Sequence, residues 1–454
     1  MKPRLHWKAL WHRSIPQSCR AGQQHTSLEG YGSLGETEAY TLGTVTSEFD
    51  VQAVRAQFPA LSRRYKGYGV VYLDGPGGSQ VVRPALQAMI QYMSNGGANL
   101  HGAFPSSIET EAIISDARSF AAAFLGAHPE EIAFGPNMTT LNLALSRALA
   151  KTWGSGDEIV VTELDHRANV DPWVRAAQDK GVRVRWLKLD LETLTLDLNH
   201  LDDVITERTK LVAVGLASNG IGTITDVARV AAAAHRVDAV VAVDAVHAAP
   251  HISIHRDALD ADILLCSAYK FFGPHIGIVA IRKSLFEALD VYKLRPAPDH
   301  IPDKLETGTQ NHEGIAGLIG ALGFIADLGA GLTLRDQLES AMMHLEQHET
   351  SMAQWIRQEI SSIQGVHMYA AGDSVRKTPT IAFTVDGMSA RQVSEVMVEN
   401  YGIFVADGDF YATTLVENLG LRETGGFVRA GLAPYNTEAE VNRFLEALVR
   451  IAKR

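Results

Sequence analysis

The feature that most constrains the fold is a repeated alternation, from residue 70 onward, of short apolar runs with segments of helical periodicity. The apolar runs are rich in β-branched residues and carry apolar side chains on both faces. Such strands belong to a mainly parallel sheet that helices cover on both sides, so the expected fold class is α/β. The expected strands are 158–162, 182–187, 211–216, 239–244, 262–267 and 276–281, and the expected helices are 138–151, 172–180 and 226–235.

The chain changes character after about residue 330. A long polar-amphipathic helix is expected over 334–360, followed by short strands at 380–385 and 402–405. A last helix is expected over 437–452, where Asn436 or Thr437 would cap its first turn. These elements predict a smaller α+β domain.

Composition excludes several classes of protein. Of 454 residues, 41 are Lys or Arg and 52 are Asp or Glu, so the net charge is −11, which argues against a nucleic-acid partner. Two cysteines, Cys19 and Cys266, exclude a disulfide framework and a cysteine zinc site. No stretch approaches the roughly 18 apolar residues of a membrane helix. A cytoplasmic protein is expected, with no membrane association and no bound metal.

Residues 1–45 are set apart from this pattern. The first 28 residues are basic and contain no acidic residue before Glu29. Organelle presequences share this composition, and an extension without a packed role fits it equally. We expect 1–45 to be an extension outside the fold.

Lys270 follows an expected strand directly and is flanked by small and aromatic residues. Ligands of parallel α/β sheets bind at the carboxyl ends of the strands. Partial dehydration there lowers the pKa of an amine and makes it a competent Schiff-base nucleophile. A lone lysine after a strand can equally be a surface residue, so Lys270 needs support from a second element.

Asp244 supplies that support, because it ends a fully apolar strand earlier in the chain. A buried carboxylate needs a cationic partner, and pyridoxal phosphate carries a ring nitrogen that must stay protonated. The alternative is that Asp244 only caps the following helix.

A possible phosphate site lies where the run Phe134-Gly135-Pro136-Asn137 leads into a helix. The N–H groups and the hydroxyls at a helix start hold phosphate well, although an ordinary capping turn would look the same. Met138, Thr139 and, beside Lys270, Ser267 could converge on one phosphate.

Taken together, these motifs resemble the class V aminotransferase family of fold-type I pyridoxal-phosphate enzymes. The branch that they resemble is the cysteine desulfurase-like one of NifS and SufS proteins. The resemblance runs from about residue 72 to the C-terminus and rests on the motifs 72–74, 98–102, 162–169, 218–222, 243–245, 267–270, 308–311 and 429–431.

The resemblance implies a seven-stranded, mainly parallel sheet in a large cofactor-binding domain over 76–325 and a small domain over 326–454. A segment over 46–75 would pack on the small domain. It also implies a homodimer with a composite active site.

The family pattern assigns roles residue by residue. Lys270 would bind pyridoxal 5'-phosphate as a Schiff base, Asp244 would pair with the ring nitrogen, and His166 would stack on the ring. The substrate of such enzymes is a small amino acid. The remaining positions divide between the cofactor (Asn219, His247, Met138, Thr139, Ser267 and, from the partner chain, Thr309) and the substrate (Arg429 for its carboxylate, with Asn219 and His101).

One departure from the family matters for the chemistry. Cysteine desulfurases carry a mobile cysteine on the loop after the Gly-Ile-x-Val strand, and here Tyr411 stands at that position. Tyrosine cannot accept a sulfane sulfur. We therefore expect no protein persulfide. Tyr411, Asp407 and Asp409 could act on the substrate side chain, with Tyr411 as an acid, or the loop could merely close the pocket.

Three outcomes remain open for an amino acid bound in such a site. These are β-elimination as a C–S or C–Se lyase, which we favour, transamination, and epimerisation. An inactive scaffold would be expected to lose Lys270 or Asp244, and both are present. A dinucleotide oxidoreductase is disfavoured, since the glycines of 215–222 do not follow the Gly-x-Gly-x-x-Gly pattern.

Overall fold

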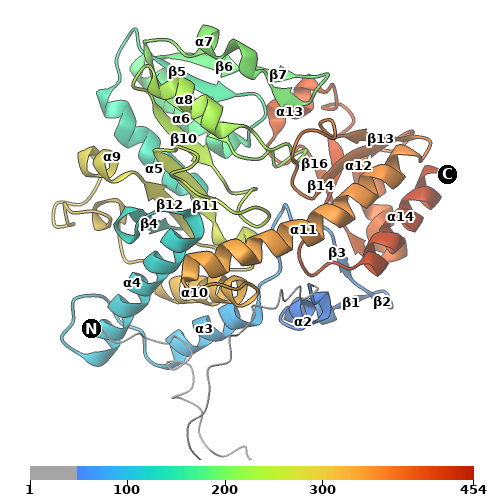
Figure 1. Cartoon of the computed structure of the whole chain (residues 1–454), viewed down its shortest axis with the longest axis horizontal. Coiled ribbons are helices and arrows are strands. Elements are labelled where there is room, and N and C mark those ends of the chain that lie inside the picture. Colours follow the sequence, from blue (N-terminus) through green and yellow to red (C-terminus); the bar gives the residue numbers. More distant parts are fainter. Residues whose placement is uncertain (1–48, 454) are drawn as a thin grey trace, which may run out of the picture. The chain divides into compact units, whose positions relative to one another are not determined.

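A seven-stranded sheet forms the centre of the larger domain in the computed structural model, which describes residues 49–453 (Figure 1). All strands run parallel except β12, which is antiparallel to both of its neighbours. The predicted extension 1–45 and Cys19 lie outside the described residues. The strand order is β4 (Ile132–Gly135), β12 (Gly277–Ile281), β11 (Ile263–Ser267), β10 (Val240–Asp244), β9 (Thr209–Gly215), β5 (Glu158–Thr162) and β6 (Arg183–Leu187).

The α/β class and all six expected strands are confirmed, with ends shifted by at most two residues. The reversed direction of β12 was not predicted, because an apolar run carries no information about its direction. The short strand β4 was marked in the sequence only by the Gly-Pro turn that follows it.

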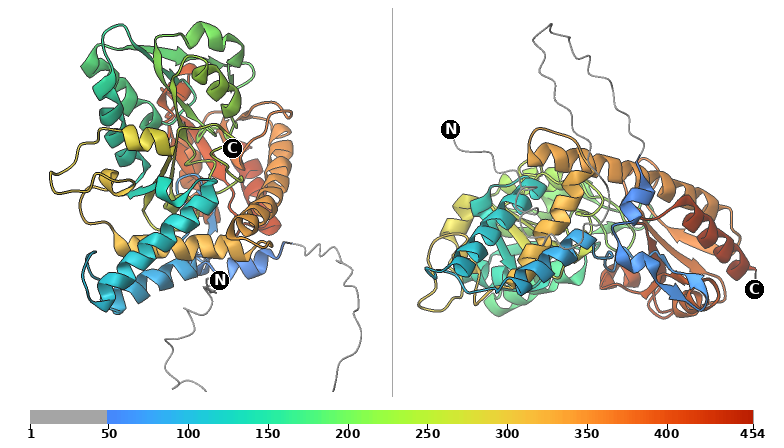
Figure 2. Two further views of the ribbon diagram at one scale, coloured as in Figure 1. Left: turned by 60° about the vertical axis from the view of Figure 1, so that its left-hand side comes forward. Right: turned by 90° about the horizontal axis from the view of Figure 1, so that it is seen from below.

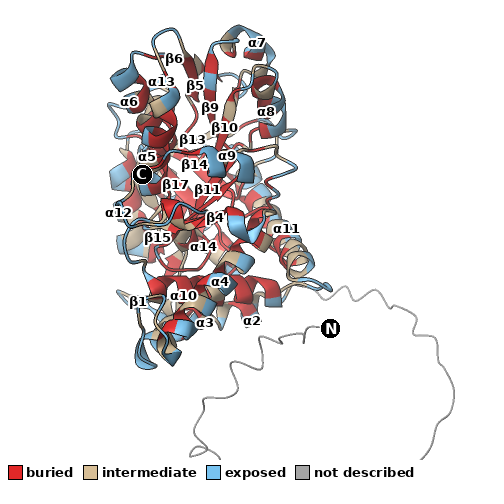
Figure 3. Ribbon diagram, turned by 90° about the vertical axis from the view of Figure 1, so that its left-hand side faces the viewer, coloured by how far each residue is buried: buried red, intermediate tan, exposed pale blue. Residues whose placement is uncertain are grey.

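The two faces of the sheet carry separate cores, because successive side chains of a strand point to opposite faces. In β5, Ile159 and Val161 belong to the same core as Trp173, whereas Val160 belongs to the core that contains Val230. Figure 3 shows the buried strands between more exposed helices. One core includes α4 (Pro105–Leu125), α8 (Val227–His235) and α10 (His312–Asp327), and the other includes α5 (Met138–Leu149), α6 (Asp171–Lys180) and α9 (Lys283–Ala288).

A four-stranded antiparallel sheet lies in the smaller α+β domain, as predicted. Thr437 caps the last helix and Glu440 completes a capping box, which confirms the predicted helix start. Three helices share the core of this sheet. The sheet contains β13 (Val366–Tyr369), β14 (Thr380–Val385), β17 (Phe427–Gly431) and β16 (Ala406–Gly408), and the helices are α11 (Leu334–Ser361), α12 (Ala390–Tyr401) and α14 (Glu438–Ala452).

Helix α11 belongs to both domains. Its first half, with Leu338 and Leu345, packs in the large core, and its second half, with Met352 and Ile356, packs in the small core. Figure 1 shows this long helix running from one sheet to the other. The domain boundaries predicted at 75/76 and 325/326 remain predictions.

The N-terminal part of the described chain lies beside the small domain (Figure 2). Strand β3 (Val71–Tyr72) pairs in parallel with β15 (Ile403–Phe404). The remaining α-helices and β-strands are short or peripheral: β1 (Arg64–Tyr65), β2 (Tyr68–Gly69), β7 (Leu189–Asp190), β8 (Thr195–Leu196), α2 (Val51–Arg55), α3 (Arg83–Ser94), α7 (Leu201–Val204) and α13 (Thr413–Asn418). Within residues 49–453 no helix is long and apolar enough to cross a membrane.

Candidate active site

A cavity of about 350 Å³ lies at the carboxyl edge of the seven-stranded sheet. Its walls include the ends of β10 and β11, the start of α5 and residues of the small domain. Its volume is in the range of cofactor and small-molecule sites. Ten residues predicted from the sequence line it together: Met138, Thr139, His166, Asn219, Asp244, His247, Ser267, Lys270, Tyr411 and Arg429.

Lys270 ends a single 3₁₀ turn that follows β11 directly. Its Nζ donates hydrogen bonds to the carbonyl oxygens of Pro76 and Gly77, and lies 4.7 Å from the centre of the Tyr269 ring. Burial, and then the positive charge of Arg429, lower the pKa of Lys270 to about 7. A large fraction of this amine is therefore neutral and nucleophilic near pH 7.

Asp244 is the last residue of β10 and is 9% exposed. Its Oδ1 accepts a hydrogen bond from the Val246 N–H at 2.8 Å. Burial, together with the nearby Asp165, raises the pKa of Asp244 to about 7. A cationic partner in the cavity would favour the ionised form of this carboxyl group.

Asp165 is a second buried carboxyl group in the cavity wall, and the sequence analysis assigned it no role. Its Oδ2 accepts a hydrogen bond from Asn169 at 2.8 Å, and burial raises its pKa to about 6. Gly215 of β9 makes room for it, because a Cβ there would lie 2.7 Å from the Asp165 Oδ1. The acidic residue immediately before His166 was the available signal.

His166 presents a neutral imidazole to the cavity. Its Nδ1 accepts a hydrogen bond from the Ala168 N–H at 3.0 Å, and its ring lies 5.3 Å from that of Tyr411. Burial, with Lys270 and Arg429, lowers the pKa of His166 to about 4. A neutral, flat ring in the wall suits stacking on an aromatic ligand.

The start of α5 forms the polar end of the cavity. The Ser267 Oγ accepts a hydrogen bond from the Met138 N–H at 3.0 Å, and the Asn137 Oδ1 accepts one from the Thr140 N–H at 2.8 Å. Thr139, between them, lines the cavity. A helix start with a threonine at the cavity is suited to a phosphate group.

Arg429 reaches the cavity from β17 of the small domain and is 4% exposed. Its Nη1 donates to the Asn219 carbonyl oxygen at 2.7 Å, whereas its Nε has no hydrogen-bond partner among the described residues. Burial lowers the pKa of Arg429 to about 10, so the guanidinium stays charged at neutral pH. A buried cation with unused donor capacity suits a carboxylate ligand.

Phe410 and Tyr411 also line the cavity, and the sequence analysis did not single out Phe410. The Phe410 ring centre lies 3.9 Å from the Arg429 guanidinium carbon, and its carbonyl accepts a hydrogen bond from Asn219 at 2.8 Å. Both residues have positive φ, +54° and +56°, an unfavourable conformation for bulky side chains. Tertiary contacts therefore hold this loop in place.

Asp407 and Asp409 do not line the cavity. Asp407 pairs with Arg391 at 3.6 Å. Asp409 accepts hydrogen bonds from the Tyr411 N–H at 3.0 Å and from the Thr413 hydroxyl at 2.8 Å. These contacts shape the loop, so we do not assign either carboxylate to the substrate side chain.

His101 and Thr309 also do not line this cavity. The His101 side chain is 82% exposed and lies 3.3 Å from the Glu111 carboxylate. Thr309 is exposed in the segment before α10. The structure of a single chain does not test the roles predicted for His101 and Thr309.

Cys266 lies inside β11 with no exposed surface. Burial raises the pKa of its thiol, which keeps it protonated and unreactive. The loop 402–412 contains no cysteine. The described chain therefore offers no accessible thiol near the cavity.

The cavity fits pyridoxal phosphate by the chemistry of its walls. It combines an amine of low pKa, a carboxyl group for a ring nitrogen, a flat imidazole and a helix start for phosphate. Asn219 Oδ1 is also buried without a hydrogen-bond partner among the described residues, which leaves a polar group for a ligand.

Comparison with known proteins agrees with this fit. The sequence profile of the class V aminotransferases matches residues 71–444. A cysteine desulfurase of an Enterobacter species is 31% identical over 422 residues, which cover 89% of this chain and 98% of that protein. An aminotransferase-like protein of Gibberella zeae is 31% identical over 412 residues, with the same shares of the two chains.

Solved structures give the same picture. The cysteine desulfurase CsdA from Escherichia coli matches with a TM-score of 0.77 and 28% identity, over 89% of this chain and 99% of that one. A cysteine desulfurase from Thermococcus onnurineus NA1 matches with a TM-score of 0.79 and 26% identity, over 88% of this chain and 98% of that one. The chain therefore belongs to the class V aminotransferase family and is a pyridoxal-phosphate-dependent enzyme of fold type I.

Proposed function

We propose that this enzyme eliminates a sulfur- or selenium-containing group from Cβ of a small amino acid, without forming a persulfide on the protein. One observation carries the proposal. Lys270, Asp244 and Arg429 converge on the cavity, whereas the only described cysteine, Cys266, is buried in β11. The cavity thus retains groups for amino-acid chemistry but lacks a thiol to receive sulfur.

Arg429 is the proposed binding group for the substrate carboxylate. The charge and the fork of N–H donors of a guanidinium match a carboxylate in two parallel hydrogen bonds. Asn219 holds the Arg429 Nη1 and the Phe410 carbonyl at the same time, so it fixes both the cation and the aromatic ring beside it. Substrate orientation then depends on these three residues.

Lys270 is the proposed attachment point of the cofactor and the proposed base for the Cα proton. Bound pyridoxal phosphate supplies an aldehyde for the substrate amine and a ring that accepts the electron pair from Cα. Asp244 would hold the proton of the ring nitrogen, and neutral His166 would pack against the ring. The low pKa of Lys270 allows its amine to accept a proton near pH 7.

Tyr411 is the proposed acid for the departing group, because its ring lines the cavity beside His166. For cysteine the net reaction consumes one water and yields pyruvate, ammonia and hydrogen sulfide. After the Cα proton is removed, the electron pair left by it forms a double bond between Cα and Cβ, and the sulfur leaves with both electrons of the broken C–S bond. No oxidant is needed.

A product screen tests the proposal. The loaded enzyme is incubated with cysteine, its sulfoxides, selenocysteine and alanine, and pyruvate, ammonia and the released sulfur or selenium compound are measured. We expect stoichiometric pyruvate from at least one substrate with a leaving group, retention of activity in C266A, and no protein-bound sulfur by mass spectrometry. Amino-group transfer to a keto acid, or loss of optical rotation without pyruvate, would replace elimination by transamination or epimerisation.

The active enzyme is further proposed to be a homodimer. Helices α3 and α4 and the segment between them expose large apolar side chains, although charged or polar residues would be expected on a solvated surface. His101 lies in the same segment, and neither it nor Thr309 reaches the cavity of its own chain. A second copy could bring both residues to the site. The exposed side chains are Leu86, Ile90, Met93, Phe104 and Ile108.

Sedimentation equilibrium tests the dimer. The wild-type chain should sediment as a dimer, and I90E with M93E should shift it toward the monomer with loss of activity. L332E provides the matched control, because Leu332 is fully exposed and nearby Arg335 contacts the C-terminal end of α4, whereas the patch includes its N-terminal end. A monomeric wild-type enzyme with full activity would exclude a composite site.

A further inference from the structure

His247 connects the cavity to the small domain through one of its ring nitrogens. The residue lies three positions after Asp244 and is 4% exposed in the cavity wall. Its Nε2 lies 3.0 Å from the Thr378 Oγ1 and 2.9 Å from the Thr380 Oγ1. Since Nε2 is occupied by these hydroxyls, Nδ1 is the ring nitrogen left to serve the cavity.

A count of hydroxyl protons assigns the direction of these hydrogen bonds. The Thr378 hydroxyl lies 3.1 Å from the Thr380 Oγ1 and 3.4 Å from the Gly222 carbonyl oxygen, and we assign its single proton to the shorter of these two contacts. The Thr380 proton is then available for the His247 Nε2. A neutral imidazole that accepts at Nε2 carries its own proton at Nδ1.

The backbone that presents the two hydroxyls is itself held in place. The Nη2 of Arg357, in α11, donates hydrogen bonds to both carbonyl oxygens, that of Thr378 at 2.7 Å and that of Thr380 at 3.1 Å. The Thr378 N–H donates to the Gly222 carbonyl at 2.9 Å. A Cβ at Gly222, where φ is +79°, would lie 2.8 Å from the Thr378 Oγ1.

The charges around His247 disfavour its protonation. Its ring lies edge-on to that of His251, with centroids 5.6 Å apart, and the positive charges of Lys270 and Arg429 repel an added proton. The His251 Nδ1 lies 2.8 Å from the Oε2 of Glu349, a buried residue of α11. Burial first, then His251, Arg429 and Lys270, hold the pKa of His247 well below its usual value.

We infer that Thr380 is a positioning residue that fixes His247 as a neutral imidazole with its proton on Nδ1, where it would be available to an acceptor oxygen of the bound cofactor. The inference rests on the proposed role of His247 toward that cofactor. Thr380 belongs to β14 of the small domain, whereas His247 follows β10 of the large sheet. The position of β14 of the small domain thus determines which ring nitrogen of His247 carries the proton available to the cavity.

Nuclear magnetic resonance of cofactor-free, ring-¹⁵N-histidine-labelled protein tests this inference without requiring activity. The His247 signals are assigned with H247Q, and its protonation is followed from pH 6 to 9. We expect the neutral Nδ1–H form throughout in wild type and in T378V, which keeps the Thr380 donor. T378V/T380V, which leaves neither hydroxyl to donate to Nε2, should lose this preference and show the Nε2–H form. A charged or Nε2–H imidazole in wild type, or an unchanged T378V/T380V, would overturn the inference.

Spectra of the loaded protein provide the second readout. A hydrogen bond from an N–H group stabilises an ionised oxygen. Loss of this donor therefore raises the apparent pKa of the acid–base group to which the oxygen belongs. The pH midpoint of the visible absorption change should therefore move upward by about one unit in T378V/T380V and stay in place in T378V. An equal shift in T378V and T378V/T380V, or none in T378V/T380V, would also contradict the inference. Absence of any cofactor band in wild type would instead reject the proposed function.

Discussion

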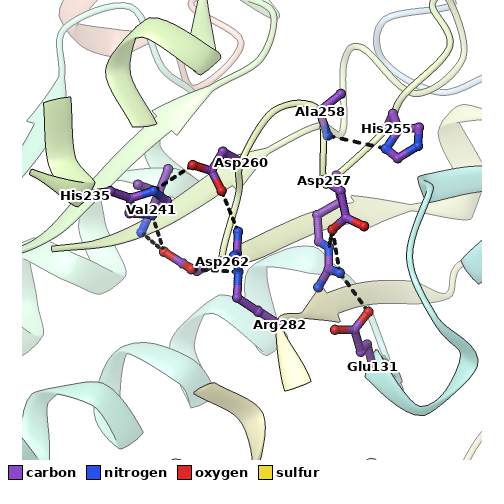
Figure 4. A network of polar contacts seen from close by, with 10 residues as sticks. Glu131, His235, Val241, His255, Asp257, Ala258, Asp260, Asp262 and Arg282 are labelled. Carbon is purple, nitrogen blue, oxygen red and sulfur yellow. Dashed lines mark hydrogen bonds and ion pairs between the residues drawn. The ribbon is translucent and has the colours of Figure 1, made fainter. Parts of the chain in front are cut away.

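The two edges of the seven-stranded sheet differ in whether their charged side chains form ion pairs with one another. At the amino edge, His235, Asp260, Asp262 and Arg282 form a network of mutual pairs (Figure 4). The His235 ring nitrogens lie 2.9 and 3.0 Å from the two aspartates, and Asp262 also accepts a hydrogen bond from the Val241 N–H. Each carboxylate of this network has a cationic or hydrogen-bonding partner.

At the carboxyl edge, the charged groups are buried around a cavity and form no ion pair with any described residue. Lys270 donates to backbone carbonyls only, Arg429 leaves its Nε unused, and Asp244 accepts one backbone hydrogen bond. The pKa values of Lys270 and Asp244 are displaced toward 7 from opposite sides. Unpaired buried charges destabilise a fold unless a ligand uses them. The difference separates a stabilising network from a binding site.

The largest predicted effect contrasts two aspartates at opposite edges. D244N removes the carboxylate proposed to hold the ring-nitrogen proton, so kcat/KM should fall by about 10²–10³-fold, on the basis of roughly 3–4 kcal/mol for one partner of a buried ion pair. D262N, the matched control in the amino-edge network, should keep activity within about twofold and lower the melting temperature. Comparable activity losses in both variants would remove the distinction between the edges.

R429K should have the next largest effect. Lysine keeps the positive charge but loses the fork of donors, so the KM for the amino acid should rise about 100-fold, which corresponds to roughly 2.7 kcal/mol. The kcat at saturation should change much less. Steady-state kinetics provide the measurement, and an unchanged KM would show that Arg429 does not bind the substrate carboxylate.

The pH dependence of cofactor attachment should follow Lys270. Only the neutral amine can attack the cofactor aldehyde. With a pKa of about 7, most of the Lys270 amine is neutral only above this pH. The rate of attachment should rise about tenfold between pH 6 and 8 and level off above pH 8. Stopped-flow absorbance measures it. A rate that continues to rise tenfold per unit to pH 9 would indicate an ordinary, solvated lysine.

The smallest predicted effect concerns the stability of the amino edge. Burial lowers the pKa of His235, but hydrogen bonds to Asp262 and Asp260 outweigh it, so the net pKa is raised. A raised folded-state pKa stabilises the protein fully below the unfolded value of about 6.5, and this stabilisation is lost as pH rises through the folded value. H235Q should cost about 1 kcal/mol or less at pH 6 and less still at pH 9. Chemical unfolding at both pH values measures this; a larger loss at pH 9 would reverse the assigned sign.

Much of the fold was predictable because it depends on local patterns. The apolar runs located the six strands, and the Thr437 cap located the last helix. Lys270 and Asp244 were found because each directly follows or ends such a run. The direction of β12 was not predictable, since it depends on how the sheet is assembled.

The rest of the site depends on contacts between distant segments. Phe410 meets Arg429, and Thr380 meets His247, only when the small domain packs on the large sheet. Asp165 was recognised as part of the site only from its burial beside Gly215 in the structure. The roles of His101 and Thr309 came from family resemblance alone, and a single chain leaves both away from its cavity.

The central claim is that the amine of Lys270 carries the cofactor. Borohydride reduction of the loaded protein, followed by proteolysis and mass spectrometry, tests this claim most directly. We predict one phosphopyridoxyl group per chain, attached to the peptide that contains Lys270, and none in K270A. Modification at another lysine, or equal labelling of K270A, would contradict the account.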